Sequence, residues 1–288
     1  MKNRYFWLII VVIIIALAGA AFYYYEQGKP RQTEVVFLDV GQGDSILIKT
    51  PLGQNILVDG GPDRSVLPAL ARNLSWWDKT IDLAVLTHPD DDHSAGLALA
   101  AERFNIRRFA YTGLVDYSPS YTALLATVKR KNISAVLIER PQTIDLGGKL
   151  FLEVLWPREN LSGRTAENSN DTSIVLRLVD GNNRFLFLGD LEAAGERSLE
   201  AAAPDALAAR TVKISHHGSD NSSSEEFLAR VAPEFAVISV GEGNKFGHPS
   251  RRVLKRLERL GARILRTDRQ GDLHFKSDGR GLSIKTGK

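Results

Sequence analysis

The longest apolar run in the chain extends from Tyr5 to Tyr25 and carries no charge over 21 positions. About 20 apolar residues in a helix cross the hydrocarbon core of a bilayer. Lys2 and Arg4 precede the run and favour a cytoplasmic N-terminus. We therefore predict a single transmembrane helix within residues 1–25 that anchors an extracytoplasmic (periplasmic or extracellular) body. The alternative is a cleaved signal peptide, because Ala18-Gly19-Ala20 is similar to an A-x-A cleavage site.

After a polar segment at residues 26–33, which is predicted to be a linker, strand and helix patterns alternate along residues 34–288. Three strand patterns separated by turn residues predict an antiparallel meander at Val35–Val40, Ser45–Lys49 and Asn55–Val58. Later strands are predicted at Ile81–Leu86, Ala135–Ile138, Phe151–Leu155, Thr172–Val179, Arg184–Leu188, Thr211–Ser215, Phe235–Val240, Arg263–Arg266 and Asp272–Lys276. Helices are predicted at Ser65–Leu74, Ser94–Phe104, Tyr121–Lys131, Ala193–Ala201, Ser224–Val231 and Ser250–Leu260. Two mixed half-sheets with helices outside them imply one α/β domain of four layers.

Composition limits the chemistry that this domain can perform. Hydrophobic residues make up 43% of the 288 and charged residues 25%, which is typical of globular proteins and excludes wholesale disorder. The sequence contains no cysteine, and this excludes disulfides, thiolate-bound zinc, iron–sulfur clusters and thiol nucleophiles. Any metal must therefore be bound by His, Asp and Glu.

A dense group of possible metal ligands follows the strand predicted at Ile81–Leu86. The segment Thr87-His88-Pro89-Asp90-Asp91-Asp92-His93 places two imidazoles and three carboxylates within six positions. Such charge at the end of a buried strand is costly unless a cation compensates it, and divalent metals accept both ligand types. The alternative is an acidic surface loop that caps the next helix. The histidines at both ends favour a metal site.

Further candidate ligands follow other predicted strands. Asp190 comes directly after an apolar strand, His216 and His217 follow Thr211–Ser215, and His248 lies in a glycine-rich loop. Adjacent side chains on an extended chain point in opposite directions, so we expect only one of the His216–His217 pair to face a metal. Five of the six histidines thus fall after strand ends. The sixth, His274, lies in an alternating strand and is expected to be structural.

The order of these motifs resembles the metallo-β-lactamase superfamily: FLDVGQGDSILI, NILVDGG, THPDDDHSAG, FLFLGD, KISHHGS and GHPS. More narrowly, the sequence is similar to the free-standing hydrolase domains of the ComEC type, which belong to DNA uptake and competence. Those domains carry H-x-D-x-D-H where most of the superfamily carries H-x-H-x-D-H. The resemblance covers roughly residues 34–285 and implies a four-layer αββα sandwich.

The resemblance implies a role for each matching residue. His88 and Asp90 would bind one metal, Asp92 and His93 the other, and Asp190 would bridge the two. His248 matches the final ligand, and the His216–His217 pair would supply one further ligand, assigned to His216, and one proton donor, assigned to His217. Asp59 would orient a ligand histidine. Asn168-Ser169-Asn170-Asp171-Thr172-Ser173 stands where many relatives have another ligand histidine. The implied cofactor is two divalent ions, Zn or Mn.

The chemistry implied by such a site is hydrolysis of phosphodiester bonds by a metal-bridging hydroxide, with Asp92 and His217 as the catalytic residues. The C-terminal 39 residues hold twelve Lys or Arg against four Asp or Glu. Five of these basic residues lie on one predicted helix beside His248: Arg251, Arg252, Lys255, Arg256 and Arg259. They suit the backbone of a nucleic acid, although a solvated helix face or attraction to anionic lipid remains an alternative.

Three functional hypotheses follow. The first is a membrane-anchored nuclease with nucleic acid as its substrate and a DNA-uptake channel protein as a possible partner. The second is a hydrolase of another extracytoplasmic ester, such as a cell-wall phosphodiester. The third is a non-catalytic DNA-binding component of an uptake apparatus.

Overall fold

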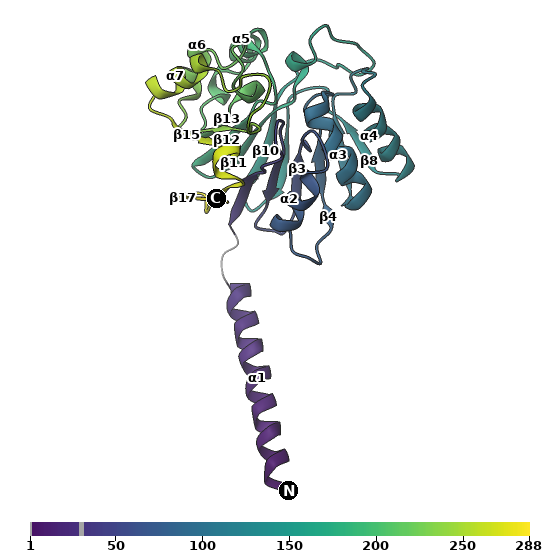
Figure 1. Ribbon diagram of the computed structural model, residues 1–288, viewed down its shortest axis with the longest axis vertical. Coiled ribbons are helices and arrows are strands. Elements are labelled where there is room, and N and C mark those ends of the chain that lie inside the picture. The colour runs from purple at the N-terminus through teal and green to yellow at the C-terminus, as the bar shows by residue number, and fades with distance from the viewer. Residues whose placement is uncertain (1, 29–31) are drawn as a thin grey trace. The chain divides into compact units, whose positions relative to one another are not determined.

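The computed structural model describes residues 2–28 and 32–288, with side chains at positions 2, 3, 6 and 23–28 left out of the description. The chain divides into two compact units, Met1–Gln32 and Thr33–Lys288. The first contains the helix α1 (Lys2–Gly28) (Figure 1). The first three residues of the predicted linker are therefore helical, and residues 29–31 of it lie outside the described residues. Among the described residues, no helix has the length and apolar character needed to cross a membrane.

The second unit is built on two large sheets. In the first sheet the spatial order is β17 (Leu282–Thr286), β16 (Leu273–Ser277), β1 (Thr33–Phe37), β2 (Ile46–Lys49), β3 (Asn55–Val58), β5 (Leu83–Val85), β7 (Arg108–Tyr111) and β8 (Ser134–Leu137). In the second it is β15 (Arg263–Arg266), β14 (Phe235–Ile238), β13 (Thr211–Lys213), β12 (Asn183–Phe187), β11 (Val175–Asp180), β10 (Leu150–Trp156) and β9 (Gln142–Gly147). A short pair, β4 (Thr80–Ile81) and β6 (Asn105–Ile106), stands apart.

Three apolar cores define four layers, as the sequence predicts. The central core lies between the two sheets and includes Phe37 of the first sheet and Phe187 of the second, whose ring centroids are 6.0 Å apart. A second core packs the first sheet against α2 (Val66–Asn73), α3 (Asp91–Arg103) and α4 (Pro119–Arg130). A third packs the second sheet against α5 (Ala193–Ala202), α6 (Glu225–Val231) and α7 (Arg251–Arg259). Figure 1 shows the two helix groups on opposite sides of the strands. A short helix, α8 (Thr267–Gln270), follows β15.

The antiparallel meander of β1, β2 and β3 is confirmed by its register. The strand predicted at Ile81–Leu86 is in fact two strands, because Asp82 leaves the pattern to accept hydrogen bonds from the Asn55 N–H and from Arg107. Four strands escaped the sequence pattern: β6, β7, β9 and β17. The helix expected to begin at Ser94 begins at Asp91, three residues earlier. Asp92 and His93 therefore lie on the first turn of α3, where carboxylates are favoured by the helix dipole.

Candidate metal centre

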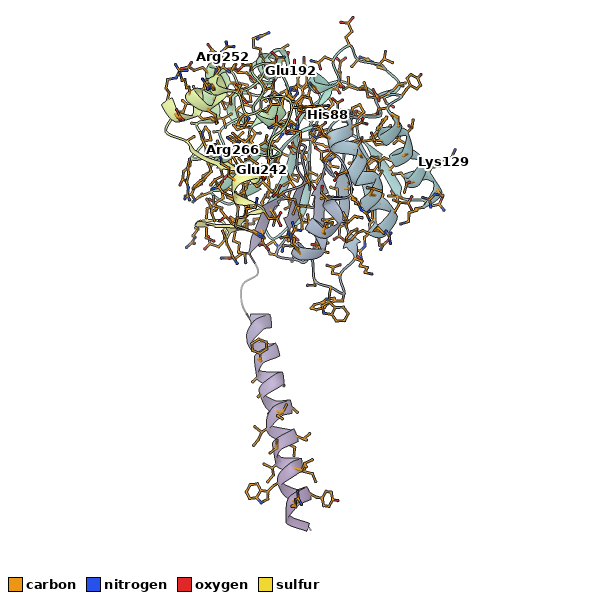
Figure 2. The ribbon with its side chains drawn as sticks, viewed as in Figure 1. His88, Lys129, Glu192, Glu242, Arg252 and Arg266 are labelled. Carbon is orange, nitrogen blue, oxygen red and sulfur yellow. The ribbon has the colours of Figure 1, made fainter. Side chains whose placement is uncertain are left out.

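The predicted ligands converge because they follow the carboxyl ends of strands. β3, β5, β7 and β8 are parallel neighbours in the first sheet, and β12 to β15 are parallel neighbours in the second. Side chains after such strands meet at one edge of the sheet. His88 follows β5 and Asp190 follows β12. Figure 2 shows His88 and Glu192 toward the same end of the domain.

Four side chains form the centre of this cluster: Asp92, His93, Asp190 and His217, each with one ligand atom within 4.8 Å of the others. His217 Nε2 lies 3.1 Å from Asp92 Oδ2 and 3.4 Å from Asp190 Oδ2. His93 Nε2 lies 3.4 Å from Asp190 Oδ1. Three of the four are buried, and Asp92 is half-buried. Two imidazole nitrogens and two carboxylates around one point suit Zn or Mn.

His88 and Asp90 adjoin this group. The His88 ring centroid is 4.1 Å from that of His93, and His88 Nε2 lies 3.8 Å from Asp90 Oδ2. Ser169 Oγ donates to Asp90 Oδ1 at 2.6 Å, so the asparagine-containing stretch noted in the sequence does reach the site. Among the described residues, the buried Nε2 atoms of His88 and His93 have no hydrogen-bond partner. Such orphaned nitrogens are costly unless something binds them, and a cation would.

His216 and His248 lie at the rim of the cluster. His216 Nε2 is 3.9 Å from Asp190 Oδ2, and its Nδ1 is 3.4 Å from Glu192 Oε1. Its ring centroid lies 5.7 Å from that of His248, which is half-buried and outside the group of four. The sequence argument assumed an extended backbone at His216 and His217, and the structure differs. Both residues are left-handed, with φ of 47° and 52°, and this tight turn sends only His217 inward.

Asp59 holds His93 and its surroundings in place. Its Oδ2 lies 2.9 Å from His93 Nδ1 and accepts the Thr87 hydroxyl at 2.7 Å, while Oδ1 accepts the Thr87 N–H at 2.8 Å. With Nδ1 fixed in this way, the other ring nitrogen of His93 is directed toward Asp190. A carboxylate behind an imidazole orients the ring and makes it a better ligand.

Lys213 and Asp44 are site residues that the sequence reasoning did not single out. The two side chains form a fully buried ion pair, and Lys213 Nζ also lies 3.4 Å from Asp190 Oδ1. Nζ donates to the Gly189 carbonyl at 3.0 Å. Two sequence features could have pointed to this pair. Lys213 lies between the apolar residues Val212 and Ile214, which are buried, and Asp44 lies in the GQGD motif. Neither signal reveals that the two side chains meet.

The charged groups of the site strongly shift one another's pKa values. Burial disfavours the charged form of Asp190, but His217, His93 and Lys213 overcome it and hold its pKa well below the usual range. Burial likewise opposes charge on His217, yet Asp190 raises the pKa of His217 well above its usual value. Burial and the neighbouring His93 lower the pKa of His88. Carboxylates that stay ionised and a neutral His88 are the states in which these groups bind metals.

Two glycines allow α3 to approach the loop after β3. A Cβ on Gly96 would lie 1.9 Å from the Gly60 carbonyl oxygen, so only glycine fits. The Gly60 N–H donates to the His93 carbonyl at 2.9 Å, and the Gly96 N–H donates to the Gly61 carbonyl at 2.9 Å. This contact fixes the first turn of α3, and with it Asp92 and His93, against the loop that carries Asp59.

The five basic residues of α7 have different surroundings. Arg256 donates to the carbonyls of Ser222 and Ser223, Arg259 pairs with Glu225 at 2.9 Å, and Arg252 lies 3.6 Å from Asp220. Arg251 and Lys255 are exposed, and within the described part of the chain neither forms an ion pair. These two are therefore the most available to an external anion. Figure 2 places Arg252 toward the same end of the domain as His88.

Comparison with known proteins identifies relatives that cover most of the chain. A family model of the metallo-beta-lactamase superfamily matches residues 38–242. Competence protein ComA of Neisseria gonorrhoeae is 31% identical over 252 residues, which cover 85% of this chain and 32% of that protein. ComE operon protein 3 of Bacillus subtilis is 27% identical over 264 residues, which cover 84% of this chain and 33% of that protein. The chain thus spans about a third of the length of these relatives.

Solved structures share the fold at low sequence identity. The metallo-beta-lactamase fold protein YhfI from Bacillus subtilis has a TM-score of 0.55 and 11% identity, with 85% of this chain and all of that chain covered. A diphosphatase from the PhnP family has a TM-score of 0.51 and 14% identity, with 85% of this chain and 98% of that chain covered.

Proposed function

This chain belongs to the metallo-beta-lactamase superfamily and is a metal-dependent hydrolase related to competence proteins, and we propose that it cleaves phosphodiester bonds of nucleic acid. The observation that carries the proposal is the cluster of Asp92, His93, Asp190 and His217. The basic helix α7 starts next to it, because its N-cap residue Ser250 donates its N–H to the Gly218 carbonyl, one residue after His217. The names of the relatives, which are competence proteins, support nucleic acid as the substrate.

The residues present fit a divalent cation. Asp92, His93, Asp190 and His217 would hold one ion, and the unpartnered Nε2 of His88, with Asp90, offers a place for a second. Bound there, such ions supply an activated water and stabilise charge on phosphoryl oxygens. The imidazoles of this set favour Zn, and its carboxylates favour Mn.

The chain's own residues position the substrate and move protons. Arg251 and Lys255 would contact backbone phosphates. The ring of His217 is fully used, since Nδ1 contacts the Ser239 carbonyl at 2.9 Å and Nε2 faces the two carboxylates. His216 is half-buried at the rim. In our proposal the two histidines therefore exchange their predicted roles: His217 is the ligand, and His216 protonates the leaving oxygen.

The test uses the purified full chain with labelled single- and double-stranded DNA and RNA, in the presence of Mn²⁺ or Zn²⁺. Cleavage is expected with at least one nucleic acid and to disappear in Asp92→Ala, while the exposed Asp145→Ala retains it. Metal content of each variant is measured in parallel. Full activity of Asp92→Ala, or no cleavage under any metal condition, rules out the proposal.

We also propose that the hydrolase domain is extracytoplasmic, that the N-terminal segment anchors it to a membrane, and that a DNA-uptake channel protein is its partner. The uncharged run from Tyr5 to Tyr25 and the competence relatives support this. Protease treatment of intact and permeabilised cells tests the location: the domain should be digested without permeabilising the inner membrane. Protection until that membrane is opened would contradict it.

A further inference from the structure

The end of the first sheet opposite the metal centre exposes large apolar side chains on two loops. Trp76 and Trp77, between α2 and β4, are 84% and 69% exposed, and their rings pack edge to face with centroids 5.4 Å apart. Leu52, in the turn between β2 and β3, is 63% exposed. Large apolar groups gathered on a surface in this way mark a contact with a partner or a membrane.

The two loops are joined at their bases by Asn55, the first residue of β3. Its side-chain amide donates to Asp78 Oδ2 at 2.8 Å and to the Thr80 carbonyl at 3.0 Å, which ties down the tryptophan loop. Asn55 also pairs with Lys49 in the hairpin whose turn carries Leu52. The three apolar side chains therefore belong to one end of the sheet.

The chain enters the domain at this same end. Glu34 pairs with Lys49 in the register of β1 and β2, so β1 starts beside the base of both loops. β3 (Asn55–Val58) leads from this end to Asp59, which lies roughly 13 Å from Asn55 at the usual rise per residue and contacts the metal centre through His93. The exposed loops and the metal centre consequently lie at opposite ends of the sheet, and β1, the first strand of the domain, begins at the end with the tryptophans.

The charge of this end complements an anionic surface. Lys79 and Arg103 are exposed there, and the Lys79 carbonyl accepts the Asn105 N–H at 2.8 Å, which brings the end of α3 beside the loop. The carboxylate of Asp78 turns inward, with Oδ1 accepting the Thr80 N–H at 3.1 Å and Oδ2 accepting from Asn55. Tryptophan with nearby basic residues is typical of proteins that sit in the headgroup region of a bilayer.

We propose that the tryptophan loop (residues 75–79) and Leu52 insert into the headgroup region of an anionic lipid bilayer, so that the metal centre faces away from the membrane. Indole rings favour this region because one edge is polar and the rest apolar. Nucleic acid could also stack on exposed indoles, but these lie at the end of the sheet away from the hydrolytic centre. The proposal stands independently of the substrate.

The test reads the tryptophans themselves in the full chain. The sequence has four tryptophans, and Trp7 is replaced by Phe. The fluorescence then comes from Trp76 and Trp77, with Trp156 as a constant background. The protein is reconstituted with vesicles of phosphatidylcholine and phosphatidylglycerol. Relative to lipid-free protein in detergent, the emission should shift to shorter wavelength, lose accessibility to iodide and be quenched by brominated phosphatidylcholine. The variant Trp7→Phe, Trp76→Phe, Trp77→Phe should lose this response.

A matched reporter sits at the other end of the domain. Tyr117 is 83% exposed, and the Ser118 hydroxyl beside it donates to the Pro89 carbonyl near the metal centre. Tyr117→Trp in the triple-Phe background should remain accessible to iodide and unquenched by brominated lipid. The proposal is overturned if Trp76 and Trp77 stay accessible to iodide on vesicles. It is also overturned if brominated lipid quenches the Tyr117→Trp reporter equally, or if an oligonucleotide causes the same response in the absence of vesicles.

Discussion

Lys213 Nζ lies 3.4 Å from Asp190 Oδ1 in the interior of the domain, and neither side chain has appreciable contact with solvent. The ammonium thus acts as a fixed cation within a carboxylate-rich site. Burial opposes its charge, but Asp44 and Asp190 raise the pKa of Lys213 above its usual value. The two aspartates remain ionised in its presence, so the carboxylate of Asp190 is available to a metal.

Lys213→Met should destabilise the domain by about 3–5 kcal/mol, because removing one member of a buried ion pair leaves an uncompensated charge. Urea unfolding of the metal-free protein measures the loss. The exposed Lys285→Met serves as control and should change little. Added Zn²⁺ or Mn²⁺ should restore part of the stability, since a bound cation also compensates Asp190. Equal stability of Lys213→Met and the parent protein would refute this account.

Asp59→Asn tests the orientation of His93. Asn is chosen because the backbone at Asp59 is left-handed, with φ of 58°, and asparagine tolerates that region. Metal affinity should fall about 10- to 100-fold, as measured by competition with a chromophoric chelator. Asp145→Asn, an exposed position on β9, should leave the affinity unchanged. An unaltered affinity in Asp59→Asn would show that His93 needs no support from this carboxylate.

Nucleic-acid binding should depend on the two unpaired basic residues of α7. For Arg251→Ala with Lys255→Ala, the slope of log K against log salt should fall by roughly 0.9 for each phosphate that the protein no longer neutralises. Fluorescence anisotropy with a labelled oligonucleotide across a salt series gives this slope. The matched control is the double variant Lys149→Ala with Lys285→Ala, which removes two exposed lysines outside α7. An unchanged slope would assign α7 to a solvated face.

Gly96→Ala separates helix propensity from packing. Propensity alone would stabilise the protein by up to about 1 kcal/mol. The new methyl group, however, would meet the Gly60 backbone, which cannot move aside as a side chain can, and such overpacking costs about 1–3 kcal/mol or more. The net effect should therefore be a lower melting temperature together with weaker metal binding. A stabilised variant would mean that the loop after β3 yields easily.

The sequence predicted the fold and the residues of the site better than it predicted the geometry of the site. Alternation and turn residues predicted the β1–β3 meander and placed β15 at the residues where the structure has it. Edge strands β9 and β17 were missed because their residues are largely exposed or half-buried, so no apolar pattern marks them.

The site was harder to predict where function depends on turns or on partners distant in sequence. Local pattern suggested that one of His216 and His217 faces inward, but the choice depends on a left-handed turn that extended-strand reasoning does not foresee. The ion pair of Lys213 and Asp44 joins β13 of the second sheet to the loop between β1 and β2 of the first, and nothing in either segment alone indicates it. Such contacts arise only from tertiary packing.

The cluster draws His93 and Asp92 from the helix after β5, and Asp190 and His217 from the ends of β12 and β13. His217 and Asp92, which stand 3.1 Å apart, are separated by 125 positions along the chain. Neither half of the sandwich holds a complete set of ligands. An ion that binds all four groups would therefore link the two halves of the domain. A chelator that removed it would weaken the packing between the halves and would also abolish hydrolysis.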